Sequence, residues 1–78
     1  MKLIYESEYI QLGLKIAYYR KLRGLTQEQL AEKIDRSPAF IGHVEAPNVN
    51  KAVSLDTLFD ISHALDVPVY KFLIFDEV

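Results

Sequence analysis

The chain has 78 residues, half of them apolar, no cysteine and a formal net charge of −2. This composition predicts one small packed domain spanning residues 1–78, and the lack of cysteine excludes disulfides and thiolate metal sites as its source of stability. No apolar run approaches the ~20 residues that span a bilayer, and the N-terminus has no signal-peptide pattern, so we expect a cytoplasmic protein with no membrane partner.

Charge is divided unevenly along the chain. The basic residues that dominate the stretch from 15 to 36 are Lys15, Arg20, Lys21, Arg23, Lys33 and Arg36. The acidic residues that dominate after residue 54 are Asp56, Asp60, Asp66, Asp76 and Glu77. We therefore expect a mildly basic half, which could contact a polyanion such as DNA, and an acidic half at the C-terminal end.

The first predicted helix begins near Ser7, after an N-terminal arm of residues 1–6. Its apolar positions recur at helical spacing and are Ile10 or Leu12, Ile16, Tyr19 and Leu22. Arg23-Gly24 ends this helix, because a base suits the last turn and glycine suits the position just beyond it.

Residues 26–45 predict two short helices joined by a tight turn. Thr26 and Gln29 have the spacing of a capping box, which satisfies N–H groups at the start of the first helix. Ser37 can cap the second helix, with Pro38 at the first helical position, where the missing N–H of proline costs nothing. Two helices joined in this way indicate a helix-turn-helix motif, whose second helix can enter the major groove of DNA.

Asp35 stands where the chain must reverse between these two helices. Such a turn favours a left-handed residue, for which Asp is acceptable after Gly. Leu30 and Ile34 on the first helix, and Ile41 and Val44 on the second, follow helical steps. We expect these four side chains to face the core.

Ala46-Pro47 ends the second helix, because the residue before a proline avoids the helical region. Ser54 caps the next helix, whose inward positions are Leu55, Leu58, Ile61 and Leu65. Val67-Pro68 is expected to break it, and residues 69–73 suggest a fifth short helix. Five helices in this length predict a compact all-α domain with a core at residues 8–73 and a tail at 74–78.

The order and spacing of these features resemble the Cro/C1-type, or Xre-like, helix-turn-helix family over about residues 12–73. The matching positions are Leu12-Gly13-x-x-Ile16, Arg20, Gly24 to Ala31, Ser37, Ile41, Glu45, Ser54-Leu55-x-Thr57-Leu58 and Ala64-Leu65-x-Val67. The resemblance implies a lambda-repressor-like five-helix fold that binds operator DNA, usually as a homodimer on a two-fold symmetric site. It also implies a structural ion pair between Arg20 and Glu45.

Carried over by position, the resemblance implies which residues meet double-stranded DNA. They are Gln27 at the start of the first helix of the motif, Ser37, Pro38, Ala39, Phe40, Gly42 and His43 on the recognition helix, and Asn48, Asn50 and Lys51 in the loop. Arg36, just before the recognition helix, is also expected to contact DNA. Pro38, Ala39 and Gly42 depart from the better-studied phage repressors, because they offer no side-chain hydrogen bonds. Specificity is therefore expected partly from thymine methyl contacts and partly from DNA shape.

Several of these residues also have a plainer interpretation. Phe40 either touches a thymine methyl group or braces the recognition helix as a half-buried aromatic residue. His43 is a base or phosphate contact or a solvated residue, and Lys33 and Arg36 are phosphate neighbours or ordinary surface residues.

The C-terminal segment carries more apolar surface than a small core can cover. We therefore expect a self-complementary dimer interface there, at Phe72, Ile74 and Phe75. Asp56 and Asp60 stand one turn apart without a nucleophile or a base beside them. We expect no enzymatic activity, metal, cofactor or small-molecule ligand.

The sequence thus favours a bacterial or phage transcriptional regulator, a homodimeric repressor of the phage, mobile-element or restriction-modification type. The alternative is a protein-interaction module or an antitoxin with the same fold and weak or no DNA binding of its own. The negative net charge and the few polar groups on the recognition helix favour that alternative.

Overall fold

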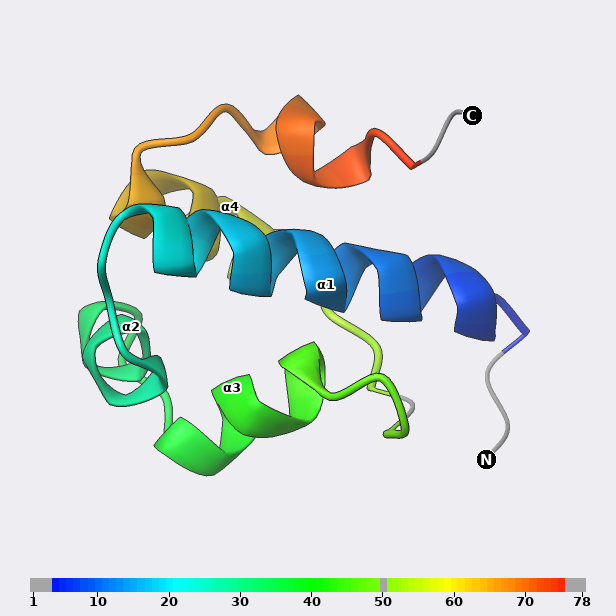
Figure 1. Cartoon of the computed structure of the whole chain (residues 1–78), viewed down its shortest axis with the longest axis horizontal. Coiled ribbons are helices and arrows are strands. Elements are labelled where there is room, and N and C mark those ends of the chain that lie inside the picture. Colours follow the sequence, from blue (N-terminus) through cyan, green and yellow to red (C-terminus); the bar gives the residue numbers. More distant parts are fainter. Residues whose placement is uncertain (1–3, 50, 76–78) are drawn as a thin grey trace.

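The computed structural model describes residues 4–49 and 51–75, which form four α-helices and a final 3-10 helix (Figure 1). The elements are α1 (Glu6–Leu22), α2 (Gln27–Lys33), α3 (Pro38–Glu45), α4 (Leu55–Leu65) and η1 (Val69–Leu73). The all-helical fold class is confirmed, and the fifth helix is a 3-10 helix. The predicted DNA contact at Asn50, residues 1–3 of the predicted arm and residues 76–78 of the predicted tail lie outside the described residues.

The long helix α1 organises the fold. It contacts α3 on one side, η1 on the opposite side and α4 behind it (Figure 1). The helices α2 and α3 pack against each other, and α2 also contacts α4. The motif of α2 and α3 is therefore attached to a scaffold of α1 and α4 rather than standing free.

The core lies where these helices meet. Its buried apolar residues are Leu12, Ile16, Leu30, Ala31, Ile34, Ile41, Val44, Leu58, Ile61, Leu65, Val67 and Phe72. The Phe72 ring is fully buried and packs edge-on against the Tyr19 ring, with 5.2 Å between their centroids. This contact fixes η1 on α1.

Two of the predicted inward positions are exposed instead. Leu22 comes three residues after the half-buried Tyr19, which rotates it by about 60° away from the buried face of α1. Leu55 precedes Leu58 by the same step and stands at the first position of α4. Three residues turn an α-helix by less than one full turn. Apolar residues that repeat at this step therefore drift off the covered face toward either end of the helix.

The ends of the helices follow the predicted signals except at the end of α4. Both hydrogen bonds of the Thr26–Gln29 capping box are present, and Ser37 and Ser54 each accept a backbone N–H three residues on. Gly24 and Asp35 have positive φ values of 75° and 58°. These caps confirm the predicted starts of α2, α3 and α4.

Helix α4 ends at Leu65, and the residue that terminates it is Asp66 rather than Pro68, which was expected to break the helix. Asp66 is left-handed, with φ of 55°, and its N–H bonds back to the carbonyl oxygens of Ser62 and His63. Arg23 then donates from Nε to the Leu65 carbonyl oxygen at 2.7 Å and from Nη2 to that of Asp66 at 2.9 Å. The guanidinium thus covers carbonyl groups that the end of a helix leaves without internal partners.

None of the helices among the described residues combines the length and the apolar character needed to cross a membrane.

Candidate nucleic-acid interface

Helix α3 turns one face to the core and the other to solvent. Ile41 and Val44 are buried, whereas the predicted DNA contacts Ser37, Pro38, Ala39 and His43 are exposed. Phe40 and Gly42, also predicted contacts, are half-buried along the edges of the exposed face. The exposed face is therefore available to a partner along the whole length of the helix.

The turn between α2 and α3 is closed by backbone hydrogen bonds. The left-handed Asp35 reverses the chain, and the Arg36 N–H donates to the Ala31 carbonyl oxygen at 2.9 Å. Ser37 then starts α3 by accepting the Phe40 N–H. These hydrogen bonds hold the turn in one conformation and thereby set the direction of α3 relative to α2.

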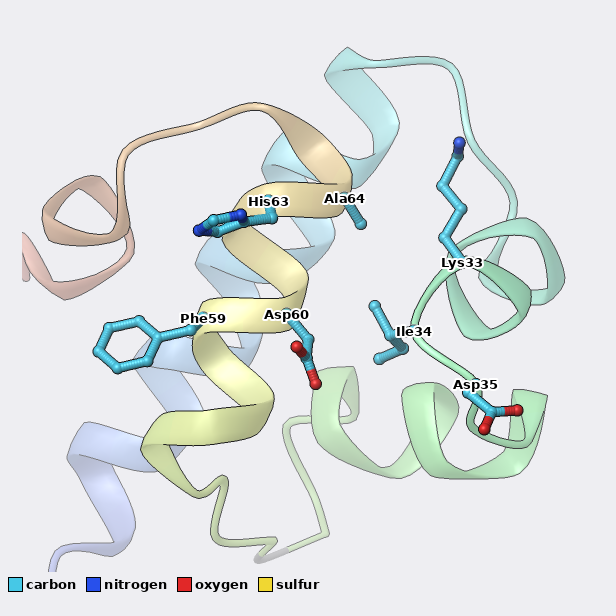
Figure 2. A pocket seen from close by; sticks show the side chains of 7 residues that line it. All are labelled: Lys33, Ile34, Asp35, Phe59, Asp60, His63 and Ala64. Carbon is cyan, nitrogen blue, oxygen red and sulfur yellow. The ribbon is translucent and has the colours of Figure 1, made fainter.

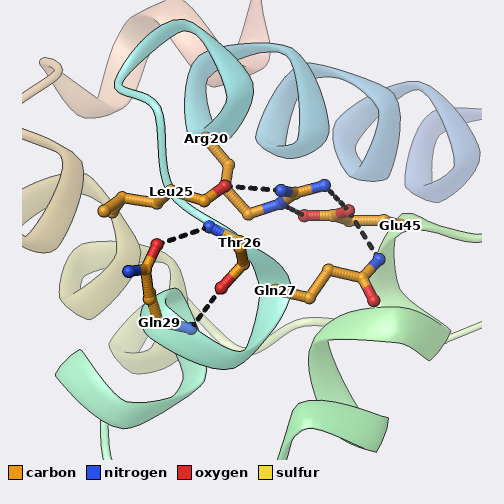
Figure 3. A network of polar contacts seen from close by, with 6 residues as sticks. All are labelled: Arg20, Leu25, Thr26, Gln27, Gln29 and Glu45. Atoms are coloured by element: carbon orange, nitrogen blue, oxygen red, sulfur yellow. Dashed lines mark hydrogen bonds and ion pairs between the residues drawn. The ribbon is translucent and has the colours of Figure 1, made fainter.

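A buried ion pair joins α1 to the last turn of α3 (Figure 3). Arg20 donates from Nε to Oε2 of Glu45 at 2.7 Å and from Nη2 to Oε1 at 2.9 Å. Both residues are only 7% exposed, and Arg20 Nη1 donates to the Leu25 carbonyl oxygen at 2.7 Å. Burial together with two parallel hydrogen bonds makes this pair an architectural element.

Gln27 extends the same network from α2 (Figure 3). Its Nε2 donates to Oε1 of Glu45 at 3.0 Å, and its Oε1 is directed toward Gly42 of α3. Gln27 is nevertheless exposed as a whole. Its amide is therefore held in one orientation at the junction of the two helices, with a second N–H left over for another acceptor. The sequence spacing gave no sign of this bond to Glu45.

Two cations gather around Phe40 at the other end of α3. The Arg36 guanidinium carbon lies 4.6 Å from the centroid of the Phe40 ring, and the Lys51 Nζ lies 5.5 Å from it. Arg36 Nη2 also donates to Thr57 Oγ1 of α4 at 2.9 Å. The bond between Arg36 and Thr57 was not predicted, because it joins residues 21 positions apart. We call Arg36, Phe40 and Lys51 the cation cluster.

The remaining predicted contacts are spread around this cluster. Asn48 is exposed in the loop after α3, and His43 is exposed one turn after Ala39. Lys33 lies apart from them, in a shallow hollow of about 690 Å³ between the end of α2 and α4 (Figure 2). His63 and Phe59, which also line this hollow, point to the far side of α4 from Lys33 (Figure 2). The hollow therefore does not bring the imidazole and the ammonium group together.

The residues predicted at a dimer interface have three different environments. Phe72 is fully buried in the core, so the expectation that it contacts a partner is wrong. Ile74 is exposed, and Phe75 is half-buried. Phe75 lines an apolar hollow of about 270 Å³ together with the exposed Leu73 and Leu55, between η1 and the starts of α1 and α4. Phe72 belongs to the core because the 3-10 helix η1 directs its side chain toward Tyr19.

Within the described ranges, no three His, Asp or Glu side chains come together in a way that could hold a metal ion.

Comparisons with known proteins agree with this geometry. A model of the helix-turn-helix family matches residues 16–72. Among solved structures, the clp gene regulator ClgR from Corynebacterium glutamicum has a TM-score of 0.79 and 32% identity, over 85% of this chain and 82% of that chain. The restriction-modification controller protein C.AhdI from Aeromonas hydrophila has a TM-score of 0.77 and 26% identity, over 85% of this chain and 97% of that chain.

A hypothetical transcription factor, NHTF from Neisseria, shares the fold with a TM-score of 0.77 at 23% identity, over 94% of this chain and 83% of that chain. No curated protein matches the sequence significantly.

Proposed function

The chain belongs to the Cro/C1-type helix-turn-helix family. We propose that it is a DNA-binding regulator that acts as a homodimeric repressor on a two-fold symmetric operator. The observation that carries this proposal is the exposed face of α3 with the cation cluster beside it. A rigid helix with cations at its edge suits the major groove and its flanking phosphates.

In this binding mode α3 enters the major groove with His43 directed at base edges. Gln27, oriented by Glu45, offers its free amide hydrogen to a phosphate or a neighbouring base. Arg36 and Lys51 neutralise phosphates beside the groove. Because Pro38 and Ala39 carry no polar side-chain atoms, they contribute van der Waals contacts rather than hydrogen bonds, and the shape of the DNA supplies part of the specificity.

The homodimer is proposed to form at the apolar hollow near the C-terminal segment. Leu55 and Leu73 are exposed apolar residues that line it, and the exposed Ile74 follows Leu73 in the chain. A monomeric protein rarely leaves such a cluster in water, and a self-complementary contact at this place would set the distance between the two copies of α3. Phe72 takes no part, because it belongs to the core.

Selection of bound sequences from random double-stranded oligonucleotides tests the proposal. We expect one palindromic site, with half-sites about one helical turn or roughly 34 Å apart, and binding that weakens steeply as salt is raised. A matched selection with Arg36→Ala/Lys51→Ala reports the contribution of the cations. If the parent protein enriches no sequence even at low salt, the repressor proposal fails.

A second candidate is a protein-interaction module or antitoxin with the same fold. The negative net charge and the absence of side-chain hydrogen-bonding groups at Pro38, Ala39 and Gly42 favour it. The same selection separates the two, since an interaction module would recover no palindrome and would show no salt-dependent retention of DNA.

A further inference from the structure

Helix α1 has a second apolar face that the fold does not use. Leu12 and Ile16 point into the core, whereas Leu14 and Tyr18 are 49% and 58% exposed. Ile10 is half-buried on the same outer face. Ile10 and Tyr18 stand four residues before and after Leu14, so the three side chains form one stripe along the helix. We call this stripe the outer face of α1.

The outer face has room for another helix. Among residues 4–49 and 51–75, no helix lies in front of α1 on the side away from α4 (Figure 1). A shallow hollow of about 320 Å³ is lined by Gln11, Leu14, Lys15 and Tyr18. These four residues have the spacing i, i+3, i+4 and i+7. Four side chains with this spacing surround a hole that receives one side chain of a neighbouring helix.

A second hollow adjoins the first on the N-terminal side. It measures about 310 Å³ and is lined by Glu6, Ser7, Ile10 and Gln11, which have the different spacing i, i+1, i+4 and i+5. The hollow between Gln11 and Tyr18 therefore fits a side chain of a partner helix.

The charges on α1 indicate which helix fits and in which direction. Glu6 and Glu8 occupy the first turn, and Lys21 is the exposed base of the last turn, since Arg20 is buried with Glu45. Glu6 lies eight residues before Leu14, and Lys21 lies seven residues after it. Two copies of α1 placed antiparallel about Leu14 would thus bring each Glu6 next to the Lys21 of the other copy.

A parallel arrangement would instead place Glu6 against Glu6 and Lys21 against Lys21. The partial charges at the helix ends also favour the antiparallel direction, because a positive N-terminus then lies beside a negative C-terminus. The charges at the two ends of the outer face are therefore complementary to those of a second, antiparallel copy.

We propose that the outer face of α1 binds the same face of a second copy, with the two helices antiparallel about a two-fold axis at Leu14. Leu14 packs on Leu14 of the other copy, and Ile10 packs on its Tyr18. This interface is separate from the proposed C-terminal dimer and does not depend on DNA binding. With both interfaces in use, the protein assembles beyond a dimer.

Sedimentation equilibrium of Leu14→Glu and Leu73→Glu tests the two interfaces separately. Both residues are about half exposed, so both variants should fold, which circular dichroism and urea unfolding check. We expect the parent to assemble beyond a dimer, each single variant to stop at a dimer, and the double variant to be a monomer. Leu14→Glu should weaken the α1 contact by at least ~100-fold, because it places two carboxylates together on the axis.

The outcomes separate this proposal from the proposed homodimer. If Leu14→Glu assembles as the parent does, the α1 interface is overturned, whatever Leu73→Glu does. If only Leu14→Glu lowers the assembly state, the α1 interface stands and the C-terminal dimer fails.

Charge exchange tests the antiparallel direction. Glu6→Lys alone and Lys21→Glu alone should each weaken the α1 contact by roughly tenfold, because each creates two pairs of like charges. The Glu6→Lys/Lys21→Glu double variant should associate as the parent does, since it restores both pairs. Equal weakening in the double variant would overturn the antiparallel arrangement. Glu32→Lys, an exposed exchange on α2, serves as the control.

Discussion

Gly13 in the middle of α1 lies directly against the carbonyl group of Val44 in α3. A Cβ built on Gly13 would overlap the Val44 carbonyl oxygen and stand 3.4 Å from the Glu45 Cα. Gly13 has no positive φ, so the position requires glycine for space and not for backbone conformation. This close approach places the end of α3 next to Arg20 and thereby permits the buried ion pair with Glu45.

Gly13→Ala should therefore destabilise the protein. Alanine normally favours a helix over glycine by about 1 kcal/mol, but here the methyl group must push two backbones apart, and we expect a net loss of about 2 kcal/mol or more. Urea unfolding measures it. Gly42→Ala is the matched control, because its Cβ would meet only Gln27 Oε1 at 3.6 Å, and it should be neutral or stabilising. Equal stability of the two variants would show that α1 and α3 can separate without cost.

The buried ion pair gives a second prediction. Glu45→Ala leaves the Arg20 guanidinium buried with only the Leu25 carbonyl oxygen as a partner, which should cost about 3 kcal/mol or more. Glu32→Ala, on an exposed part of α2, should stay within about 0.5 kcal/mol of the parent. An unfolding midpoint for Glu45→Ala near that of the parent would show that the pair does not contribute to stability.

Much of this fold is predictable from local signals in the sequence. Thr26, Ser37 and Ser54 cap helices through hydrogen bonds that reach only three residues ahead, so spacing alone indicates them. Asp35 at the turn is predictable for the same reason. Helical periodicity also indicates most of the core.

Contacts between distant segments were not predictable in this way. The bonds from Arg36 to Thr57, from Gln27 to Glu45 and from Arg23 to the end of α4 join residues 18 to 43 positions apart. Periodicity predicted that Leu22 faces the core, and the excess of apolar residues near the C-terminus predicted that Phe72 faces a partner. Neither pattern shows which neighbour covers a given side chain. Packing in three dimensions decides these cases.

The left-handed turn residue gives a third prediction. Asp35→Gly should leave the free energy of unfolding unchanged or raise it by up to about 1 kcal/mol, because glycine adopts φ of 58° without strain. Asp35→Val should lose about 1–2 kcal/mol, since a β-branched residue is strained there. Glu32→Val, in the right-handed backbone of α2, is the control and should lose less than Asp35→Val. Equal losses in the two valine variants would contradict the left-handed turn.

The proposed DNA contacts of His43 and Lys51 predict two different defects in DNA binding. His43→Ala should relax the base preference in a binding selection, with roughly three- to tenfold loss of discrimination at the contacted position. Lys51→Ala should weaken binding to all sequences and lower the slope of log affinity against log salt by about one. Lys71→Ala, on η1, is the charge-matched control. If neither His43→Ala nor Lys51→Ala changes affinity or preference, the DNA does not lie along α3.

Arg36 has two roles in the proposed interface, and a pair of variants can separate them. Thr57→Val removes the hydroxyl group that Arg36 Nη2 binds at 2.9 Å but keeps the cation and the shape of the side chain. It should weaken DNA binding by roughly threefold without changing the salt dependence, because the guanidinium loses only its brace. Arg36→Ala also removes the phosphate contact, so it should weaken binding by about tenfold and lower the salt slope by about one. Arg36→Lys, which keeps the charge, should restore the slope. If Arg36→Ala leaves the slope unchanged, Arg36 only positions Phe40 and α4, and Lys51 alone carries the phosphate contact of the cation cluster.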